Sequence, residues 1–223
     1  MDTWNTVIYY WPELVVSLKE TAIMMSISLL FCLVIGLPLG VYLYLVNPSQ
    51  KSYNPLIYYS LNFFITLIRS FPYLLLVVTL IPVTRMVVGR AFGPIPAAVP
   101  LSLVAIAIFA RLVEQVLLDL PESTQQLADS LGVTRWQLIW HFLLVEARSG
   151  IVLAFTTTTV SLVSYSTVMG IVGGGGIGDF AIRYGYQRYE YGIMYVAIVW
   201  MIASVFVIQL GGNALARKID KRK

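Results

Sequence analysis

The sequence contains few charged residues, one cysteine and one histidine, and each shortage excludes a class of protein. Charged residues make up 12% of the 223 positions, about half their share in soluble domains, whereas 58% are hydrophobic. Cys32 alone cannot form a disulfide within the chain or a thiolate metal site, and His141 alone cannot form a histidine cluster. The composition does not fit a water-soluble globule, and we expect no metal and no other cofactor in this chain.

Long uncharged runs indicate an integral membrane protein instead. Charge-free stretches occupy residues 21–50, 91–110, 149–178 and 191–216, and each reaches or exceeds the roughly 20 residues that cross a bilayer core. Residues 52–84 form a fifth candidate, interrupted only by Arg69. Lipid cannot satisfy a bare loop or an open sheet edge. We therefore predict an all-α membrane protein, a single domain over residues 1–223, with five spanning helices at about 14–46, 55–84, 93–118, 148–172 and 192–216.

The basic residues predict how these helices are oriented. Five of them crowd the last seven positions, directly after the fifth predicted span: Arg217, Lys218, Lys221, Arg222 and Lys223. Such a tail is typical of a cytosolic end beside anionic lipid, so the net charge of +4 gives no reason to expect a nucleic-acid partner. Alternation then puts the N-terminus outside and the C-terminus in the cytosol of a multi-pass protein of the cell membrane. An odd number of spans argues against two inverted repeats and favours a pathway between two copies of the chain.

The predicted cytosolic segment 121–145 has the pattern of a helical hairpin. Pro121 suits a first helical turn, and Gly132 stands where a helix ends in a left-handed residue. Thr134 and Gln137 have the spacing of a capping box for a second helix. One face of the first helix carries Leu120, Thr124, Leu127 and Leu131, and an apolar stripe on the second carries Trp136, Ile139, Trp140 and Leu143. These amphipathic helices fit two locations, the headgroup layer of the membrane or a groove on a cytosolic partner.

A resemblance to a known family favours the second location. The segment reads Gln126-Leu127-Ala128, three residues, Gly132, nine residues, then Phe142-Leu143-Leu144-Val145. It resembles the cytoplasmic signature of ABC-importer permeases, Glu-Ala-Ala, three residues, Gly, nine residues, Ile, any residue, Leu-Pro. The spacing is intact, although Gln126 replaces Glu, Leu127 replaces Ala, Phe142 replaces Ile and Val145 replaces Pro. Further stretches, namely 69–72, 81–85, 165–179 and 183–189, extend the likeness over nearly the whole chain to the permease subunit of methionine-importing ABC transporters.

The resemblance implies an architecture and a set of partners. It implies a homodimeric permease of the type I importer kind, two copies of a cytosolic ATPase that bind ATP and Mg, and an extracytoplasmic binding protein that delivers an amino acid, with methionine as the expected substrate. The chain itself would be no enzyme. The residues expected to couple the permease to the ATPase lie in the hairpin: Gln126, Leu127, Ala128, Gly132, Trp136, Trp140 and Leu144.

Two sequence motifs bear on nucleotide binding. Gly173, Gly175 and Gly178 satisfy G-x-G-x-x-G, but they follow an apolar span without the alternating strands and helices of a dinucleotide site. No P-loop motif occurs, so energy must come from a partner or an ion gradient. The glycine run predicts that the fourth span unwinds at its outer end, either as a flexible loop or as a close-packed or moving element. The tyrosine-rich segment beyond it fits an outer aromatic belt or a surface for a docked binding protein: Tyr184, Tyr186, Tyr189 and Tyr191.

Ionisable residues within apolar runs are costly and usually functional. Arg111 and Glu114 lie three positions apart on one helix face, so we expect a structural ion pair. Arg69 precedes Pro72, which leaves the carbonyl of residue 68 without its helical donor. Whether Arg69 satisfies such carbonyls or lines a wet cavity stays open. Candidates for the translocation path or gate are Arg69, Ser70, Tyr165, Ser166 and Met169.

Two rival functions follow from the same composition. An ion-driven secondary transporter or channel would need more membrane carboxylates, and the odd span count also weighs against it. A membrane scaffold would need no defined helix-glycine-helix loop. A permease site for an amino acid's backbone calls for paired charges or helix termini, and no such cluster is visible within the predicted spans.

Overall fold

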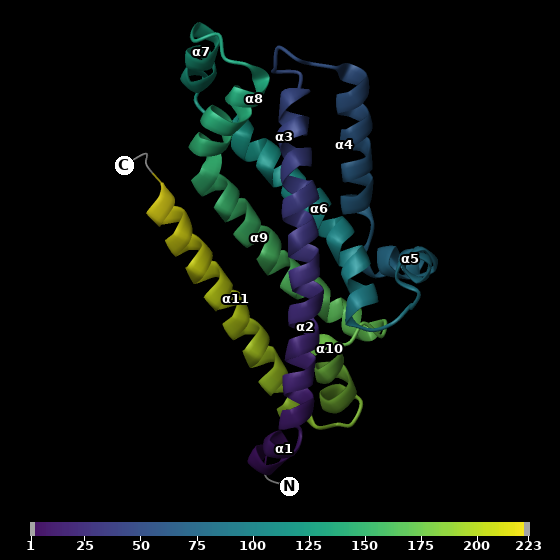
Figure 1. The fold of residues 1–223 in the computed structure, drawn as a ribbon. Coiled ribbons are helices and arrows are strands. Elements are labelled where there is room, and N and C mark those ends of the chain that lie inside the picture. Colours follow the sequence, from purple (N-terminus) through teal and green to yellow (C-terminus); the bar gives the residue numbers. More distant parts are fainter. Residues whose placement is uncertain (1–2, 221–223) are drawn as a thin grey trace.

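The computed structural model describes residues 3–220, and every regular element in that range is a helix (Figure 1). The predicted all-helical fold is therefore confirmed. Four helices are long and apolar enough to cross a membrane within the described range, and a bent pair brings the number to five if it counts as one span. Three residues of the predicted basic tail, Lys221, Arg222 and Lys223, lie outside the described residues.

The first long helix is continuous from Trp11 to Leu45. It follows the short helix α1 (Thr3–Tyr9) and consists of α2 (Trp11–Phe31), a π-helical segment (Cys32–Gly36) and α3 (Leu37–Leu45). Pro38 lacks the N–H that an α-helix needs at this position, and the wider π-helical turn lies directly before α3. The chain thus keeps its direction through a proline.

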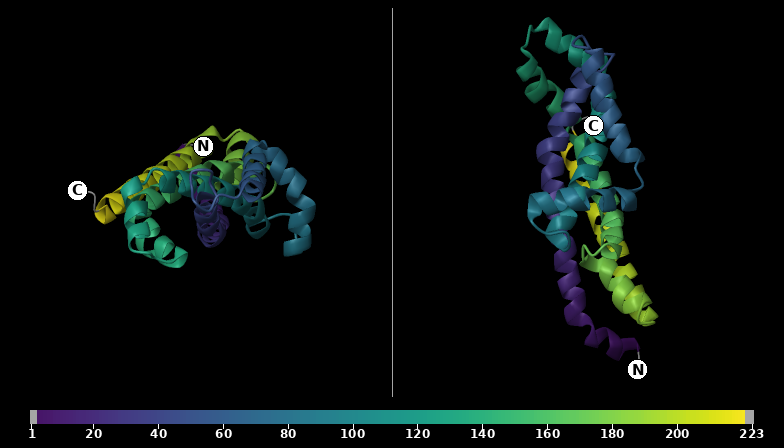
Figure 2. Two further views of the ribbon diagram at one scale, coloured as in Figure 1. Left: turned by 90° about the horizontal axis from the view of Figure 1, so that it is seen from above. Right: turned by 90° about the vertical axis from the view of Figure 1, so that its right-hand side faces the viewer.

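The segment expected to form one helix over 55–84 consists instead of two helices bent by 109°. Helix α4 (Pro55–Ser70) begins after Asn54, whose side chain accepts a 3.3 Å hydrogen bond from the N–H of Ile57. Helix α5 (Tyr73–Val88) begins after Pro72. A residue before proline is pushed out of the α region, and Phe71 accordingly has an extended backbone (φ −71°, ψ 129°). Pro72 therefore breaks the predicted span, and α5 runs across the bundle (Figure 2).

Helix α6 (Pro94–Leu118) is the central helix of the fold. It contacts α2, α3, α4, α5 and α9, and alanines and large apolar residues alternate along its buried surface. Gly40 allows α3 to approach it closely, because a Cβ there would lie 2.6 Å from the carbonyl oxygen of Ala110 and 2.7 Å from Cβ of Val113. Small residues let helix backbones approach closely in membranes, and Gly40 has this role at the crossing of α3 and α6.

The remaining elements form the two ends of the molecule and the long helices between them. Helices α7 and α8 lie at one end and α1 and α10 at the other, with α9 and α11 running between them (Figure 1). Their bounds are α7 (Glu122–Ser130), α8 (Arg135–Gln137), a π-helical segment (Leu138–Leu143), α9 (Leu144–Ile171), α10 (Gly176–Phe180), a second such segment (Ala181–Tyr186) and α11 (Tyr191–Ile219). The first helix and the end of α11 point toward opposite ends of the long axis (Figure 1).

Candidate functional site

The predicted hairpin turn is present at Gly132. Gly132 has a left-handed backbone (φ +62°), and the N–H of Val133 donates to the carbonyl of Ala128 at 3.3 Å. The hydroxyl of Thr134 accepts from the N–H of Gln137 at 3.3 Å, and the Gln137 side chain accepts in return from the N–H of Thr134 at 2.9 Å. This reciprocal pair is the capping box that the sequence predicted.

The second helix of the hairpin differs from the prediction because it does not end before the fourth span. Helix α8, the π-helical segment and α9 form one continuous helix from Arg135 to Ile171. A single continuous helix therefore connects the hairpin turn to the far end of α9.

The hairpin presents an apolar surface that other parts of the described chain do not cover. Trp136 is 69% exposed and Trp140 is 53% exposed, and their rings meet edge to face with centroids 5.8 Å apart. Leu127 in α7 and Leu131 directly after it are also exposed. Ala128 and Leu143 instead face inward and are buried, and Leu144 is half-buried. We call the four exposed residues the hairpin surface: Leu127, Leu131, Trp136 and Trp140.

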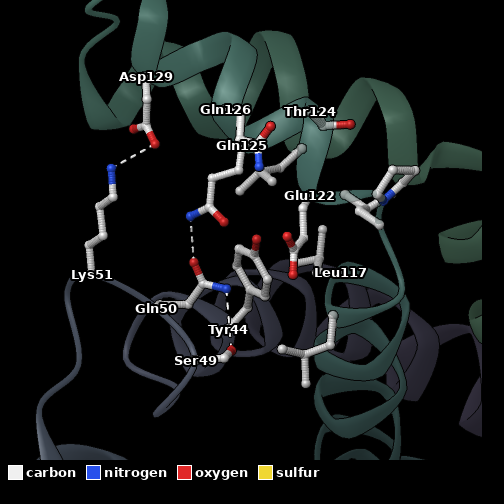
Figure 3. A pocket seen from close by; sticks show the side chains of 14 residues that line it. Tyr44, Ser49, Gln50, Lys51, Leu117, Glu122, Thr124, Gln125, Gln126 and Asp129 are labelled. Carbon is white, nitrogen blue, oxygen red and sulfur yellow. Dashed lines mark hydrogen bonds and ion pairs between the residues drawn. The ribbon is translucent and has the colours of Figure 1, made fainter.

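The opposite side of α7 is tied to the loop between α3 and α4. Lys51 forms a 2.7 Å ion pair with Asp129, and the amide of Gln125 donates to the side-chain oxygen of Gln50 at 2.6 Å. Between these contacts lies a cavity of about 330 Å³ that Gln126 also lines (Figure 3). Lys51 and Gln50 thus hold α7 from the loop that precedes α4.

The same loop is anchored to the central helix. The amide of Asn47 donates to Glu114 at 3.0 Å and to the hydroxyl of Tyr58 at 3.3 Å, while its own oxygen accepts from the N–H of Ser49 at 3.0 Å. Arg111 forms the predicted ion pair with Glu114 at 2.6 Å. These contacts connect α7 through the 47–54 loop to α6. The sequence alone does not predict them, because Lys51 and Asp129 are 78 positions apart and no spacing pattern connects them.

The five candidate path residues do not form one cluster. Arg69 and Tyr165 line a common pocket at the break between α4 and α5, whereas Ser70 is exposed at the end of α4 and is not among the residues lining that pocket. Ser166 is buried and donates to the carbonyl of Val163 on its own helix at 2.7 Å. Met169 is buried beside Ala97 in the main core and lines a different, smaller cavity.

The glycine run after α9 is held tightly. Helix α9 ends at Ile171, as the predicted unwinding required. The carboxylate of Glu20 accepts from the N–H of Gly176 at 2.8 Å, and the hydroxyl of Thr21 accepts from the N–H of Ile177 at 2.9 Å. Of the two alternatives, a flexible loop and a close-packed element, the contacts favour the close-packed element. No strand accompanies the glycines anywhere in residues 3–220, so the motif lacks the setting of a dinucleotide site.

Polar and aromatic residues gather beyond the glycine run. Asp179 forms a 2.8 Å ion pair with Arg183. Burial raises the pKa of the Asp179 carboxyl, the Arg183 guanidinium opposes this, and the nearby Glu20 carboxylate raises it further. The Arg188 guanidinium lies 4.9 Å from the ring centroid of Tyr184 and donates to the hydroxyl of Tyr10 at 3.3 Å. Part of the tyrosine cluster therefore packs against the start of the chain, while Tyr186 and Tyr189 are exposed.

Comparison with known proteins yields consistent matches. Residues 36–223 match the family described as binding-protein-dependent transport system inner membrane component. The chain is 42% identical over 203 residues to a probable D-methionine transport system permease protein of Vibrio cholerae serotype O1, covering 91% of this chain and 90% of the relative. It is 37% identical over 212 residues to the protein described in the same words from Pasteurella multocida, covering 95% of this chain and 98% of the relative.

Solved structures give the same result in three dimensions. A chain of the MetNI methionine ABC transporter in inward-facing conformations superposes with a TM-score of 0.91 at 37% identity, covering 93% of this chain and 96% of that one. The fold and the sequence thus agree over nearly the full length.

Proposed function

Because the chain belongs to the family of binding-protein-dependent transport system inner membrane components, we propose that it imports methionine as the permease of an ATP-driven complex. Its relatives are permease subunits of an ABC importer and not enzymes. In the proposed complex two copies of the chain form the path, two cytosolic ATPase subunits bind ATP and Mg, and an extracytoplasmic binding protein delivers the substrate. The substrate assignment is supported by the relatives' names, which specify D-methionine.

One structural observation carries the coupling role. The hairpin surface exposes two tryptophans on the helix that continues without interruption into α9, and two leucines in and directly after α7. Buried apolar anchors of this kind dominate the energetics of protein interfaces, with tryptophan prominent among them. We propose that the ATPase covers the hairpin surface and that its movement is passed along Arg135–Ile171 to the glycine run.

The contacts between the 47–54 loop and α7 give this movement a second route. Lys51 and Gln50 contact α7, and Asn47 in the same loop contacts Glu114 on α6. A displaced α7 would pull on the 47–54 loop and through it on α3, α4 and α6. The hairpin residues Gln126, Ala128, Gly132 and Leu144 would set the position of the hairpin surface relative to this loop.

The rival of ion-driven transport loses support in the family match. Ion-driven transport would also need a carboxylate that is free to bind the ion. Glu114 is not free, since Arg111 and Asn47 occupy both of its oxygens. Both oxygens of this carboxylate are therefore engaged in contacts within α6 and between α6 and the 47–54 loop.

The proposed function is tested by reconstitution. The full chain, its ATPase and its binding protein are incorporated into liposomes, and uptake of labelled methionine is followed with and without internal ATP. We expect uptake only with ATP and with all three components, competed by unlabelled D-methionine and L-methionine. Uptake that follows an imposed ion gradient in the absence of ATP would contradict the proposal.

A further inference from the structure

A polar pocket of about 300 Å³ lies where the bent pair α4 and α5 meets α6 and α9. Its polar residues come from three elements: Arg69 from the last turn of α4, Tyr73 from the first turn of α5, and Ser161 and Tyr165 from α9. Val104 and Ile108 of α6 supply an apolar wall. The break between α4 and α5 is visible in Figure 1. The pocket therefore combines one cation, hydroxyl groups and apolar surface within the membrane-spanning part of the fold.

Arg69 is the unusual member of this group because it has no anionic partner. The ion pairs among residues 3–220 are Lys51 with Asp129, Arg111 with Glu114 and Arg183 with Asp179, and Arg69 takes part in none of them. A charged side chain within a membrane-spanning segment is costly and is usually retained for a function. Arg69 is exposed at the edge of the pocket, whereas Glu114, which is buried in α6, is neutralised locally by Arg111. The uncompensated guanidinium of Arg69 is therefore free to take its counter-charge from outside the chain.

Tyr73 supplies a second unsatisfied group. Its hydroxyl is buried without a hydrogen-bond partner in the described chain, although buried hydroxyls are normally bonded. Its ring lies against that of Tyr165, with centroids 4.6 Å apart and planes inclined by 47°. The pocket thus holds a guanidinium and a phenol, neither with a hydrogen-bond or ion-pair partner in the described chain, and aromatic packing between α5 and α9 fixes the phenol.

The broken helix adds to the positive character of the pocket. Tyr73 is the first residue of α5, a helix of 16 residues, and Leu76 is the first position whose N–H bonds back to Pro72. The leading N–H groups of any helix lack intrahelical acceptors and carry partial positive charge. Membrane transporters use such interrupted helices to bind anionic groups of their substrates near the middle of the bilayer.

We propose that the pocket of Arg69, Tyr73 and Tyr165 binds the α-carboxylate of the transported amino acid during its passage. This inference rests on the proposed function, because an amino acid must reach the pocket from the path. Arg69 would bind the carboxylate through its guanidinium, and the Tyr73 hydroxyl would donate a further hydrogen bond. The tyrosine faces suit the substrate's ammonium group, and Val104 and Ile108 suit an apolar side chain.

The test measures substrate binding without the binding protein. The complex of the full chain and its ATPase is placed in nanodiscs of neutral lipid, and labelled methionine is titrated by scintillation proximity. Unlabelled methionine and methioninamide, which lacks the carboxylate charge, serve as competitors. The ATPase is the same in every sample, so any difference between variants of the permease arises in the permease.

The expected results distinguish charge from structure. Arg69→Gln should weaken binding of methionine by about 10- to 100-fold, the range expected for a lost charge-assisted hydrogen bond, and should abolish the preference for methionine over methioninamide. Arg69→Lys keeps the charge and should restore part of the affinity and the preference. Tyr73→Phe should weaken binding by about three- to tenfold. Arg85→Gln and Tyr195→Phe change exposed residues outside the pocket and should bind within about twofold of the wild type.

Three outcomes would overturn the inference. The first is wild-type affinity and selectivity in Arg69→Gln that assembles normally with the ATPase. The second is a loss of binding in Arg69→Gln that affects methionine and methioninamide equally. The third is anionic lipid that co-purifies with the wild-type complex and is lost from Arg69→Gln with no change in amino-acid binding, which would make the pocket a headgroup site. ATP-driven uptake by the wild type in liposomes is measured separately, so failure of the subsite and failure of the import function remain distinguishable.

Discussion

Asn47 donates a hydrogen bond of 3.0 Å to Glu114, a carboxylate that is 1% exposed and that pairs through its other oxygen with Arg111 at 2.6 Å. The contact joins the end of the first long helix to the central helix across 67 positions of sequence. Because Asn47 also holds Ser49 in the loop that braces α7, Glu114 lies at the inner end of the connection between the hairpin and the spanning helices.

We expect Glu114→Ala to destabilise the chain by about 3–5 kcal/mol, because it leaves Arg111 and Asn47 without their buried partner. Glu114→Gln, which can still accept both bonds, should be milder. Cys32 is 0% exposed and is the only cysteine, so the rate at which a thiol-reactive dye labels it on heating reports unfolding. Glu122→Ala, at an exposed position of α7, is the control and should match the wild type. Equal labelling of all variants would show that the buried carboxylate does not stabilise the fold.

Local spacing in the sequence predicted the hairpin turn and the capping box correctly because their geometry depends on residues close in sequence. Gly132 follows a helix, and Thr134 and Gln137 cap the next one three positions on. The break at Pro72 is also predictable from local sequence, since a residue before proline, here Phe71, is pushed out of the α region. The proline was noted, but an uninterrupted helix was expected because apolar composition alone set the span.

Contacts between distant segments could not be predicted in this way. Arg69 and Tyr165 are 96 positions apart, and only the folded chain shows that they line one pocket. Sequence spacing cannot reveal such a pair, so no cluster for an amino acid's backbone was expected within the spans. An arginine next to a helix-breaking proline inside an apolar run was the one local signal for this site.

The pKa of Asp179 predicts how the outer end responds to pH. Burial raises this pKa in the folded chain, so the folded state binds the proton more tightly than the unfolded state does. The resulting stability is fully present below the unfolded pKa and is lost as pH rises through the folded pKa. We expect the thermal midpoint, followed by tryptophan fluorescence, to fall less between about pH 4 and pH 7 in Asp179→Asn than in the wild type. A steeper fall in the variant would show that the Arg183 ion pair outweighs burial.

The orientation of the chain gives a prediction for its two ends. With five spans and a basic tail, a reporter fused after Lys223 should be active in the cytosol, and one fused before Met1 should be active outside. A reporter inserted after Gly132 should match the C-terminal one, because the hairpin and the tail are expected on the same side. If both ends report the same side, α4 and α5 do not together make one crossing.

Gln126 stands where the family signature has a glutamate, so we expect its contact with the ATPase to be a neutral hydrogen bond. Such a bond contributes roughly 1 kcal/mol, whereas a charge-assisted one contributes up to about 3. Gln126→Ala should therefore weaken association with the ATPase by about tenfold or less in quantitative pull-downs, and Gln126→Glu should strengthen it if a basic residue faces this position. Trp136→Ala, which removes a large exposed anchor from the hairpin surface, should weaken association more. Complete loss of the ATPase from Gln126→Ala would mean that this position contributes more than one neutral bond.

Gly132 provides the sharpest test of coupling because its environment separates backbone strain from crowding. A Cβ at Gly132 would meet nothing within 4 Å, so a substitution acts only through the left-handed backbone at φ +62°. Valine is strained there by about 1–2 kcal/mol, whereas asparagine tolerates the conformation. Gly132→Val should redirect Trp136 and Trp140 and so reduce methionine uptake severely at equal membrane levels, while Gly132→Asn should remain near normal. Gly211→Val, on an open face of α11, is the matched control for the same substitution. Near-normal uptake by Gly132→Val with an intact hairpin surface would mean that the hairpin rests on the membrane and does not couple the ATPase to the path.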